Sequence, residues 1–265
     1  MDETLEFAVA TARAAGDVLM ERFEGALQVS RKSAAGDLVT DADRASEAVI
    51  LGRIRERYPD HAILAEESGR SGSATLQWIV DPLDGTTNYA HRLPHFSVSI
   101  ALVDAEGPVV GVIHDPVRGE TFAGRRGGGA FLDSARARGR GGPVRLAVSE
   151  VAALGEALVA TGFPYVRVSD NLPEVVRLVP KIRCLRRGGS AALDLAYVAA
   201  GRLDGYWEAR LAPWDVAAGI LLVREAGGVV TRMHGEAWTL EYGDVTAGGQ
   251  WLHAQLVGEL QAARG

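Results

Sequence analysis

The sequence predicts a mixed α/β fold in which helices open the chain, strands dominate its middle and the two alternate in the second half. Apolar residues recur at helical spacing through residues 5–23, a pattern typical of an amphipathic helix. Between residues 62 and 132, short apolar runs separated by Gly, Pro or Asp indicate strands, several of them antiparallel. Beyond residue 157, strand-like and helix-like runs alternate, which indicates an α/β layer.

Two helices are expected near the N-terminus. The first covers residues 5–23, and Gly25 follows it as a stop signal. The second begins near Thr40, which can cap the helix, while Asp41 and Asp43 favour the positive end of its dipole. A polar loop over residues 30–37 separates the two helices and has the composition of a surface segment.

The middle of the chain contains six candidate strands, at 62–65, 76–80, 97–103, 108–113, 120–124 and 130–132. The basic segment 133–143 follows them and is the strongest shift in composition, which makes it the best candidate for a subdomain boundary. Its arginines alternate with small residues and lack interleaved aromatic side chains, which favours a solvated hairpin tip; nucleic-acid binding is the alternative. We therefore divide the chain into an N-terminal α+β subdomain, residues 1–143, and a C-terminal α/β subdomain, residues 144–265.

The second half supplies the remaining elements. Strands are expected at 157–160, 182–185, 205–208 and 229–232. Helices are expected at 172–179, 190–200 and 216–226, the last of which is apolar on every side and ends at Gly227.

Composition and charge exclude several classes of protein. Of the 265 residues, 47% are hydrophobic and 23% are charged, which excludes a disordered or fibrous chain. The net charge of −6 provides no general attraction to nucleic acid or to anionic membranes. The lone Cys184 excludes an intramolecular disulfide and fits a reducing cytoplasm, so a metal would require oxygen or imidazole ligands. The acidic N-terminus lacks a signal-peptide pattern, and the longest apolar run, residues 216–223, is too short to span a bilayer.

The most informative pattern is the segment Trp78-Ile-Val-Asp-Pro-Leu-Asp-Gly-Thr-Thr-Asn-Tyr89, in which a hydrophobic strand runs into two carboxylates. Hard divalent cations prefer oxygen, so Asp81, Asp84 and the Leu83 carbonyl are candidate Mg²⁺ ligands. The following main-chain amides are candidate phosphate donors and belong to Gly85 and Thr86. The alternative is an ordinary strand-to-helix turn, since Asp, Pro and Gly are common turn residues.

Three further acids have a functional and a structural interpretation each. Glu66 ends an apolar strand and is the inward-facing member of its Glu-Glu pair, although a charged strand terminus is the alternative. Asp215 stands between Trp214 and the apolar helix, and Asp43 stands in the first turn of its own helix. Either aspartate alone is explained by capping of a helix N-terminus.

Taken together, four segments in the same order resemble the inositol monophosphatase family. Trp78–Tyr89 resembles the first signature of that family, and Trp214–Gly228 resembles the second. Two shorter matches cover Gly36–Asp43 and Leu64–Ser68. The joint match spans nearly the whole chain and favours metal binding over the capping interpretations.

The resemblance implies specific roles, with two or three Mg²⁺ ions per active site. The implied metal ligands are Glu66, Asp81, Leu83, Asp84 and Asp215. The implied catalytic residues are Asp43, Glu66 and Thr86, of which Asp43 and Thr86 position the attacking water. The implied substrate contacts are Gly85, Thr86, Gly189, Ser190, Ala191, Glu208 and Asp215. Lys32 matches a lysine on the family's mobile loop, and Arg210 is a candidate contact for an anionic or extended substrate, with a solvent-facing arginine as the alternative.

The function implied by the resemblance is Mg²⁺-dependent hydrolysis of inositol 1-phosphate and related polyol or sugar phosphates. Our mechanistic hypothesis is in-line attack by a metal-activated water without a phosphoenzyme. The alternatives are fructose 1,6-bisphosphatase or another metabolite phosphatase of the family, and a bacterial-type regulatory protein that binds RNA or the transcription complex. The resemblance also implies a Li⁺-sensitive homodimer and a layered α/β/α/β/α sandwich with an N-terminal antiparallel sheet and a C-terminal mixed sheet.

Overall fold

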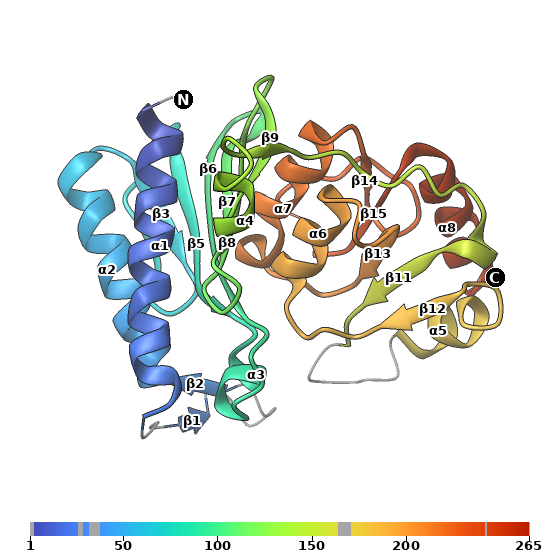
Figure 1. The fold of residues 1–265 in the computed structure, drawn as a ribbon, viewed down its shortest axis with the longest axis horizontal. Helices are drawn as coiled ribbons and strands as arrows, with labels where there is room; N and C mark the ends of the chain where they lie inside the picture. The colour runs from blue at the N-terminus through green and yellow to red at the C-terminus, as the bar shows by residue number, and fades with distance from the viewer. Residues whose placement is uncertain (1–2, 26–28, 32–37, 164–170, 242, 265) are drawn as a thin grey trace.

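Five layers of helix and sheet make up the computed structural model, which describes residues 3–25, 29–31, 38–163, 171–241 and 243–264. From one end to the other, the layers are α1 with α2, an eight-stranded sheet, α6 with α7, a five-stranded sheet, and α5 with α8 (Figure 1). The expected α/β/α/β/α sandwich is therefore confirmed.

The eight-stranded sheet has the order β10-β9-β8-β7-β6-β5-β3-β4 and is antiparallel except for the parallel pair of β3 with β5. In chain order, its strands are β3 (Ala62–Ala65), β4 (Gly69–Ser71), β5 (Gln77–Asp84), β6 (Ser97–Asp104), β7 (Gly107–Asp115), β8 (Glu120–Arg125), β9 (Gly129–Asp133) and β10 (Val144–Arg145). The antiparallel character predicted for the first half of the chain thus holds for six of the seven neighbouring pairs of this sheet, counted from the strand order.

Two helices cover the outer face of this sheet, α1 (Glu3–Phe23) and α2 (Asp41–Arg57). The spaced apolar residues of α1 point inward and are buried, including Leu5 and Leu19. Thr40 caps α2 as predicted, because its Oγ1 accepts a hydrogen bond from the Ala42 N–H at 3.2 Å.

The five-stranded sheet has the order β12-β11-β13-β15-β14 and is mixed, as expected. The pairs that include β11 are parallel, whereas those that include β15 are antiparallel. Its strands are β11 (Leu158–Thr161), β12 (Cys184–Arg186), β13 (Gly205–Glu208), β14 (Val229–Thr231) and β15 (Val245–Gly248).

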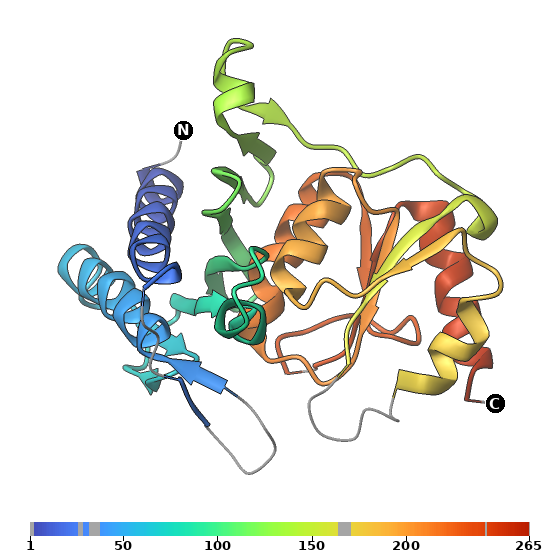
Figure 2. The same ribbon diagram turned by 60° about the horizontal axis from the view of Figure 1, so that its bottom comes forward.

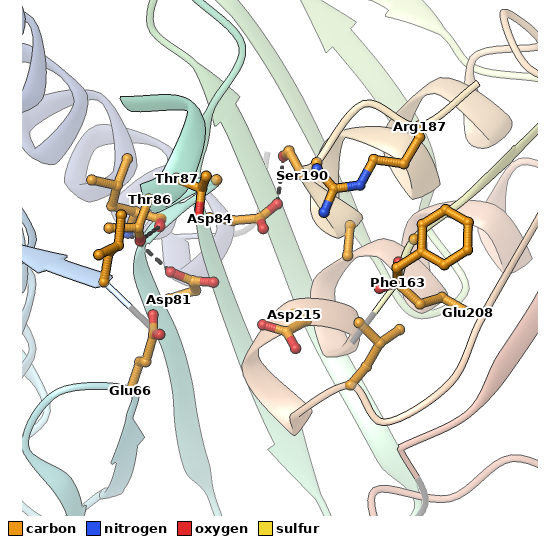
Figure 3. A pocket seen from close by; sticks show the side chains of 17 residues that line it. Glu66, Asp81, Asp84, Thr86, Thr87, Phe163, Arg187, Ser190, Glu208 and Asp215 are labelled. Carbon is orange, nitrogen blue, oxygen red and sulfur yellow. Dashed lines mark hydrogen bonds between the residues drawn. The ribbon is translucent and has the colours of Figure 1, made fainter. Parts of the chain in front are cut away.

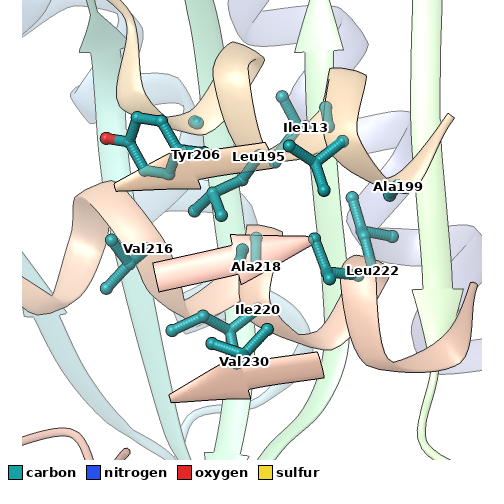
Figure 4. Close-up of a cluster of buried hydrophobic side chains, with 14 of the residues drawn as sticks. Ile113, Leu195, Ala199, Tyr206, Val216, Ala218, Ile220, Leu222 and Val230 are labelled. Carbon is teal, nitrogen blue, oxygen red and sulfur yellow. The ribbon is translucent and has the colours of Figure 1, made fainter. Parts of the chain in front are cut away.

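The middle layer carries the largest part of the core. It consists of α6 (Ala191–Ala199) and α7 (Pro213–Glu225), which pack against each other and against both sheets. Ile220 and Leu222 of α7 are fully buried; Leu222 lies on the side of Ile113 of β7, whereas Ile220 lies beside Val230 of β14 (Figure 4). This burial explains why α7 is apolar on every side, since each such side chain stabilises the fold by about 1.5–3 kcal/mol.

The remaining elements are two helices on the outer face of the second sheet and several short segments. The helices α5 (Leu172–Leu178) and α8 (Gln250–Ala262) cover the outer face of the second sheet (Figure 2). The others are β1 (Val29–Arg31), β2 (Leu38–Thr40), α3 (Thr86–Ala90), α4 (Ala135–Arg138) and the 3₁₀ helix η1 (Leu154–Glu156).

The predicted strands and helices are confirmed with shifts of a few residues at their ends, apart from the strand expected at 76–80, which is longer and continues to Asp84. The basic segment 133–143 connects the antiparallel pair β9 and β10, as a hairpin tip does, but it contains the short helix α4 that the sequence did not predict. The division of the chain at residue 143 stays a prediction. Within the described residues, no helix combines the length and apolarity that crossing a membrane requires.

The close contact between β7 and α7 gives a stability prediction. A Cβ added at Gly111 would stand 2.8 Å from the Ala218 carbonyl oxygen of α7. We expect Gly111→Ala to lower the free energy of unfolding by about 1–3 kcal/mol through overpacking. Gly52→Ala is the control, because it adds a Cβ on α2 with no atom within 4 Å and should stabilise by about 0.5–1 kcal/mol. Urea unfolding measures both; a Gly111→Ala variant as stable as the wild type would contradict the contact.

Candidate active site

A polar pocket lies where the two sheets approach each other around the N-termini of α6 and α7 (Figure 3). Carboxylates reach it from both halves of the chain: Glu66 follows β3, Asp81 and Asp84 belong to β5, and Asp215 lies in the first turn of α7. The pocket encloses about 670 Å³ of space that is open to solvent.

Local geometry at the end of β5 places its two aspartates on this pocket. The pairing of β5 with β6 shifts register between Asp81 and Asp84, which marks an irregularity in the strand. The Leu83 N–H donates to Asp81 Oδ1 at 2.9 Å, so the bend is held by the aspartate itself. Gly85 then takes a left-handed conformation with φ 99° and leads into α3. The segment therefore does connect a strand to a helix, and it also points two carboxylates into a pocket.

Behind the pocket wall, Thr86 and Asp43 form a hydrogen-bonded pair. Thr86 Oγ1 lies 3.0 Å from Asp43 Oδ1 and 3.0 Å from the Leu83 carbonyl oxygen. The other Asp43 oxygen accepts from the Thr40 N–H at 2.8 Å and from Thr40 Oγ1 at 2.6 Å. Asp43 is fully buried and reaches the pocket only through Thr86, so the capping role and the proposed functional role belong to one side chain.

Helix N-termini hold the two acids on the opposite side. The Ala212 N–H donates to Asp215 Oδ2 at 2.7 Å at the start of α7. Asp84 Oδ2 accepts from the Ala192 N–H of α6 at 2.8 Å and from Ser190 Oγ. These neutral donors orient the carboxylates and partly offset their loss of water.

The pocket concentrates negative charge. Burial raises the pKa of Asp81 well above its ordinary value, and the charges of Glu66 and Asp84 raise it further. Burial, followed by the charge of Asp84, likewise raises the pKa of Asp215. Burial raises the pKa of Asp84 to about 6 against the lowering effect of the hydrogen bonds from Ser190 and Ala192. A bound cation would remove the repulsion that these pKa values report.

The donor chemistry fits a hard divalent cation. Carboxylate and carbonyl oxygens are the ligands that Mg²⁺ prefers, and five predicted ligand residues line this one pocket: Glu66, Asp81, Leu83, Asp84 and Asp215. Among the described residues, no three acidic, histidine or cysteine side chains are already gathered closely enough to hold a metal. To coordinate a metal ion, the carboxylates that line the pocket would therefore have to rotate toward one another.

The far wall carries the residues predicted to contact a substrate. Gly189, Ser190, Ala191 and Glu208 all line the pocket. The Tyr206 hydroxyl donates to Glu208 Oε2 at 2.6 Å, while burial raises the pKa of Glu208 to about 7. A Cβ at Gly162 would overlap the Glu208 carboxylate in its present position, so a larger residue there would have to displace that side chain.

Several pocket residues were not predicted from the sequence: Leu38, Thr87, Gly162, Phe163, Arg187 and Leu211. Of these, Arg187 stands two residues before Gly189, so its place in the same motif was an available signal. Arg210 does not line the pocket in the described part of the chain and adopts a left-handed conformation with φ 65°. Lys32 lies outside the described residues.

Comparison with known proteins places this chain among close relatives. A sequence profile of the inositol monophosphatase family matches residues 1–264. The chain is 44% identical over 263 residues to an inositol-1-monophosphatase of Synechocystis sp., covering 97% of this chain and 88% of that protein. It is also 44% identical over 256 residues to Nus factor SuhB of Escherichia coli, covering 94% of this chain and 92% of that protein.

Solved structures show the same similarity. The crystal structure of extragenic suppressor protein suhB from Bartonella henselae has a TM-score of 0.90 and 40% identity, covering 97% of this chain and 98% of that chain. The inositol monophosphatase from Anabaena has a TM-score of 0.85 and 41% identity, covering 98% and 95%. The fold is therefore shared with these proteins.

The raised carboxyl pKa values predict how stability depends on pH. A carboxyl group whose pKa is higher in the folded than in the unfolded state binds more protons when the protein is folded. The free energy of unfolding therefore falls as the pH rises from the unfolded-state pKa through the folded-state pKa. With a chelator present, we expect a lower melting temperature at about pH 8 than at about pH 6, the range that contains the pKa of about 6 for Asp84 and of about 7 for Glu208, and Mg²⁺ should remove most of that difference. Burial lowers the pKa of His95 and His114 below the ordinary value of 6.5, so these side chains make the folded state more stable as the pH rises and cannot cause the expected loss.

Asp215→Asn should reduce the difference between the two melting temperatures measured with chelator. Glu21→Gln, which changes an exposed acid on α1, should leave that difference unchanged. A metal-free melting temperature that is equal or higher at the alkaline end would contradict the charge repulsion described above.

Proposed function

The chain belongs to the inositol monophosphatase family, and from this we propose that it is a Mg²⁺-dependent phosphomonoesterase acting on inositol 1-phosphate and related polyol or sugar phosphates. The observation that carries the proposal is the convergence of four acids from separate elements on one pocket that also contains Thr86. The products would be the free alcohol and inorganic phosphate.

The proposed cation site uses oxygen ligands from both halves of the chain. Glu66, Asp81 and the Leu83 carbonyl would hold one ion, and Asp81, Asp84 and Asp215 would hold a second. When bound, Mg²⁺ supplies positive charge that neutralises phosphate oxygens and lowers the pKa of a nearby water. The four carboxylates alone would repel a phosphate dianion, which is why the function requires metal.

In the proposed mechanism, Thr86 and Asp43 orient the water and accept its proton. Burial raises the pKa of Asp43 to about 6 against the hydrogen bonds from Thr40 and Thr86, so Asp43 is ionised at neutral pH and can accept the Thr86 proton. The Thr86 hydroxyl oxygen is then available to accept a hydrogen bond from water. Glu66 lies on the same wall and would assist.

The far wall would bind the alcohol part of the substrate. Gly189 and Ala191 offer main-chain groups there, and the buried Glu208 carboxylate can accept hydrogen bonds from sugar hydroxyls. Gly85 and Thr86 would receive the phosphate between the two walls. The expected homodimer, Li⁺ sensitivity and cytoplasmic location stay predictions.

Arg187 favours a second substrate class for the same site. Its exposed side chain extends toward the pocket from the segment before α6 (Figure 3), and its charge lowers the pKa of Glu208. The Arg187 guanidinium, on the wall opposite Glu66, could form an ion pair with a second anionic group of the substrate, such as the second phosphate of fructose 1,6-bisphosphate.

Phosphate release with and without Mg²⁺ tests the proposal, on inositol 1-phosphate, fructose 1,6-bisphosphate, histidinol phosphate and adenosine 3′,5′-bisphosphate. We expect the highest kcat/KM on inositol 1-phosphate and a loss of more than about 100-fold in Asp215→Asn, since even residues that only support metal ligands contribute up to that factor. Glu21→Gln should match the wild type. The absence of Mg²⁺-dependent phosphate release from all four compounds would refute the proposal. A higher kcat/KM on fructose 1,6-bisphosphate than on inositol 1-phosphate would favour the second substrate class, described above for Arg187.

An RNA-binding role is a separate candidate. Arg136 and Arg140 are exposed on the projecting β9–β10 connection (Figure 2), whereas Arg138 pairs with Asp133 at 3.3 Å. Several relatives of this chain are named Nus factor SuhB. Phosphate contacts from these arginines would be independent of base sequence.

For this candidate, we expect RNA affinity to fall steeply between about 50 mM and about 200 mM salt, and to fall further in the double variant Arg136→Ala with Arg140→Ala. Arg55→Ala removes an exposed arginine on α2 and serves as the control. Binding that is insensitive to salt, or unaffected by the double substitution, would exclude this surface.

A further inference from the structure

We propose that Ser190 is a positioning residue, whose hydroxyl fixes the Asp84 carboxylate against the start of α6 so that Asp84 is presented to a cation. The inference rests on the proposed function for the identity of the cation. It assigns Ser190 to the metal side of the site, whereas the family resemblance implied contact with a substrate.

The contacts join segments that are more than a hundred residues apart. Ser190 Oγ donates to Asp84 Oδ2, and the Ala192 N–H donates to the same oxygen at 2.8 Å. Ser190 is 1% exposed and Asp84 is 8% exposed. Because two donors from one helix start converge on one oxygen, α6 helps to orient a carboxylate that β5 carries, together with Ser97 of β6.

The hydrogen-bonding capacity of the Ser190 hydroxyl is already committed. Its single proton is directed to Asp84, and its oxygen accepts from the Leu193 N–H at 3.3 Å as the cap of α6. Ser97 Oγ, fully buried on β6, lies 3.4 Å from the same oxygen. A hydroxyl engaged on three sides has no remaining donor to offer a substrate.

The start of α6 adds an electrostatic contribution. The helix is nine residues long, and its N-terminus carries partial positive charge toward Asp84. This charge and the Ser190 hydroxyl favour the ionised carboxylate, the form that binds a cation. Removing the hydroxyl should therefore weaken cation binding while leaving the wall that faces the alcohol part of the substrate in place.

Isothermal titration of the full chain with Mg²⁺ tests this inference directly. We expect Ser190→Ala to weaken Mg²⁺ binding by about tenfold or more, the factor that corresponds to one hydrogen bond to a charged group. Ser190→Thr keeps the hydroxyl and should restore binding. Ser134→Ala is the matched control, because Ser134 caps α4 through the Ala137 N–H at 3.1 Å but does not line the pocket.

If Ser190→Ala does not fold, Ser190→Cys replaces the hydroxyl with a weaker donor and should give intermediate Mg²⁺ affinity. At saturating Mg²⁺, the KM for inositol 1-phosphate should change little in the folded variants. An unchanged Mg²⁺ affinity in Ser190→Ala, or a raised KM with unchanged Mg²⁺ affinity, would overturn the inference.

The two proposals fail in different ways. Wild-type protein that binds Mg²⁺ but releases no phosphate contradicts the proposed function, while the titration of the Ser190 variants still decides the positioning role. Conversely, active enzyme whose Mg²⁺ affinity is indifferent to Ser190 contradicts only the positioning role.

Discussion

Mutual repulsion among four carboxylates in one pocket is the constraint on which the rest of the site depends. Asp81 is only 2% exposed, and the acids around it raise its pKa in addition to burial. Burying like charges is unfavourable unless donors or cations compensate. The two sheets and the helices between them provide the donors, and the proposed metal ions would provide the remaining charge.

Helix N-termini supply those donors from three directions. Asp43 accepts from the start of α2, Asp215 from the start of α7, and Asp84 from the start of α6, although Asp84 belongs to a strand. The partial positive charge of each helix start stabilises an ionised carboxylate. Helix capping and a role in the site are therefore compatible in this fold, because the N–H groups at a helix N-terminus also orient the candidate functional carboxylates.

Periodicity alone was sufficient for elements whose packing is simple. The spaced apolar residues of α1 and the uniformly apolar α7 predicted their own burial, and most strands were found from short apolar runs. The helix α8 and the strand β15 were not predicted from the sequence. The length of β5 was also underestimated, since Asp81 and Asp84 have the composition of a turn yet remain paired with β6.

The residues of the candidate site also fall into predicted and unpredicted groups. Carboxylates in recognisable motifs could be predicted by resemblance, and the structure brings them into one pocket. Gly162 was missed because inclusion in a pocket depends on how separate segments pack, which the spacing within one motif does not specify. Arg187 was missed although it belongs to the same motif as Gly189. The most direct test of the proposed cation site is a crystal structure of the Mn²⁺-soaked protein with anomalous difference maps. We expect peaks beside Glu66 and Asp81 and between Asp84 and Asp215; a fully occupied Mn²⁺ elsewhere, with none in this pocket, would contradict the proposed cation site.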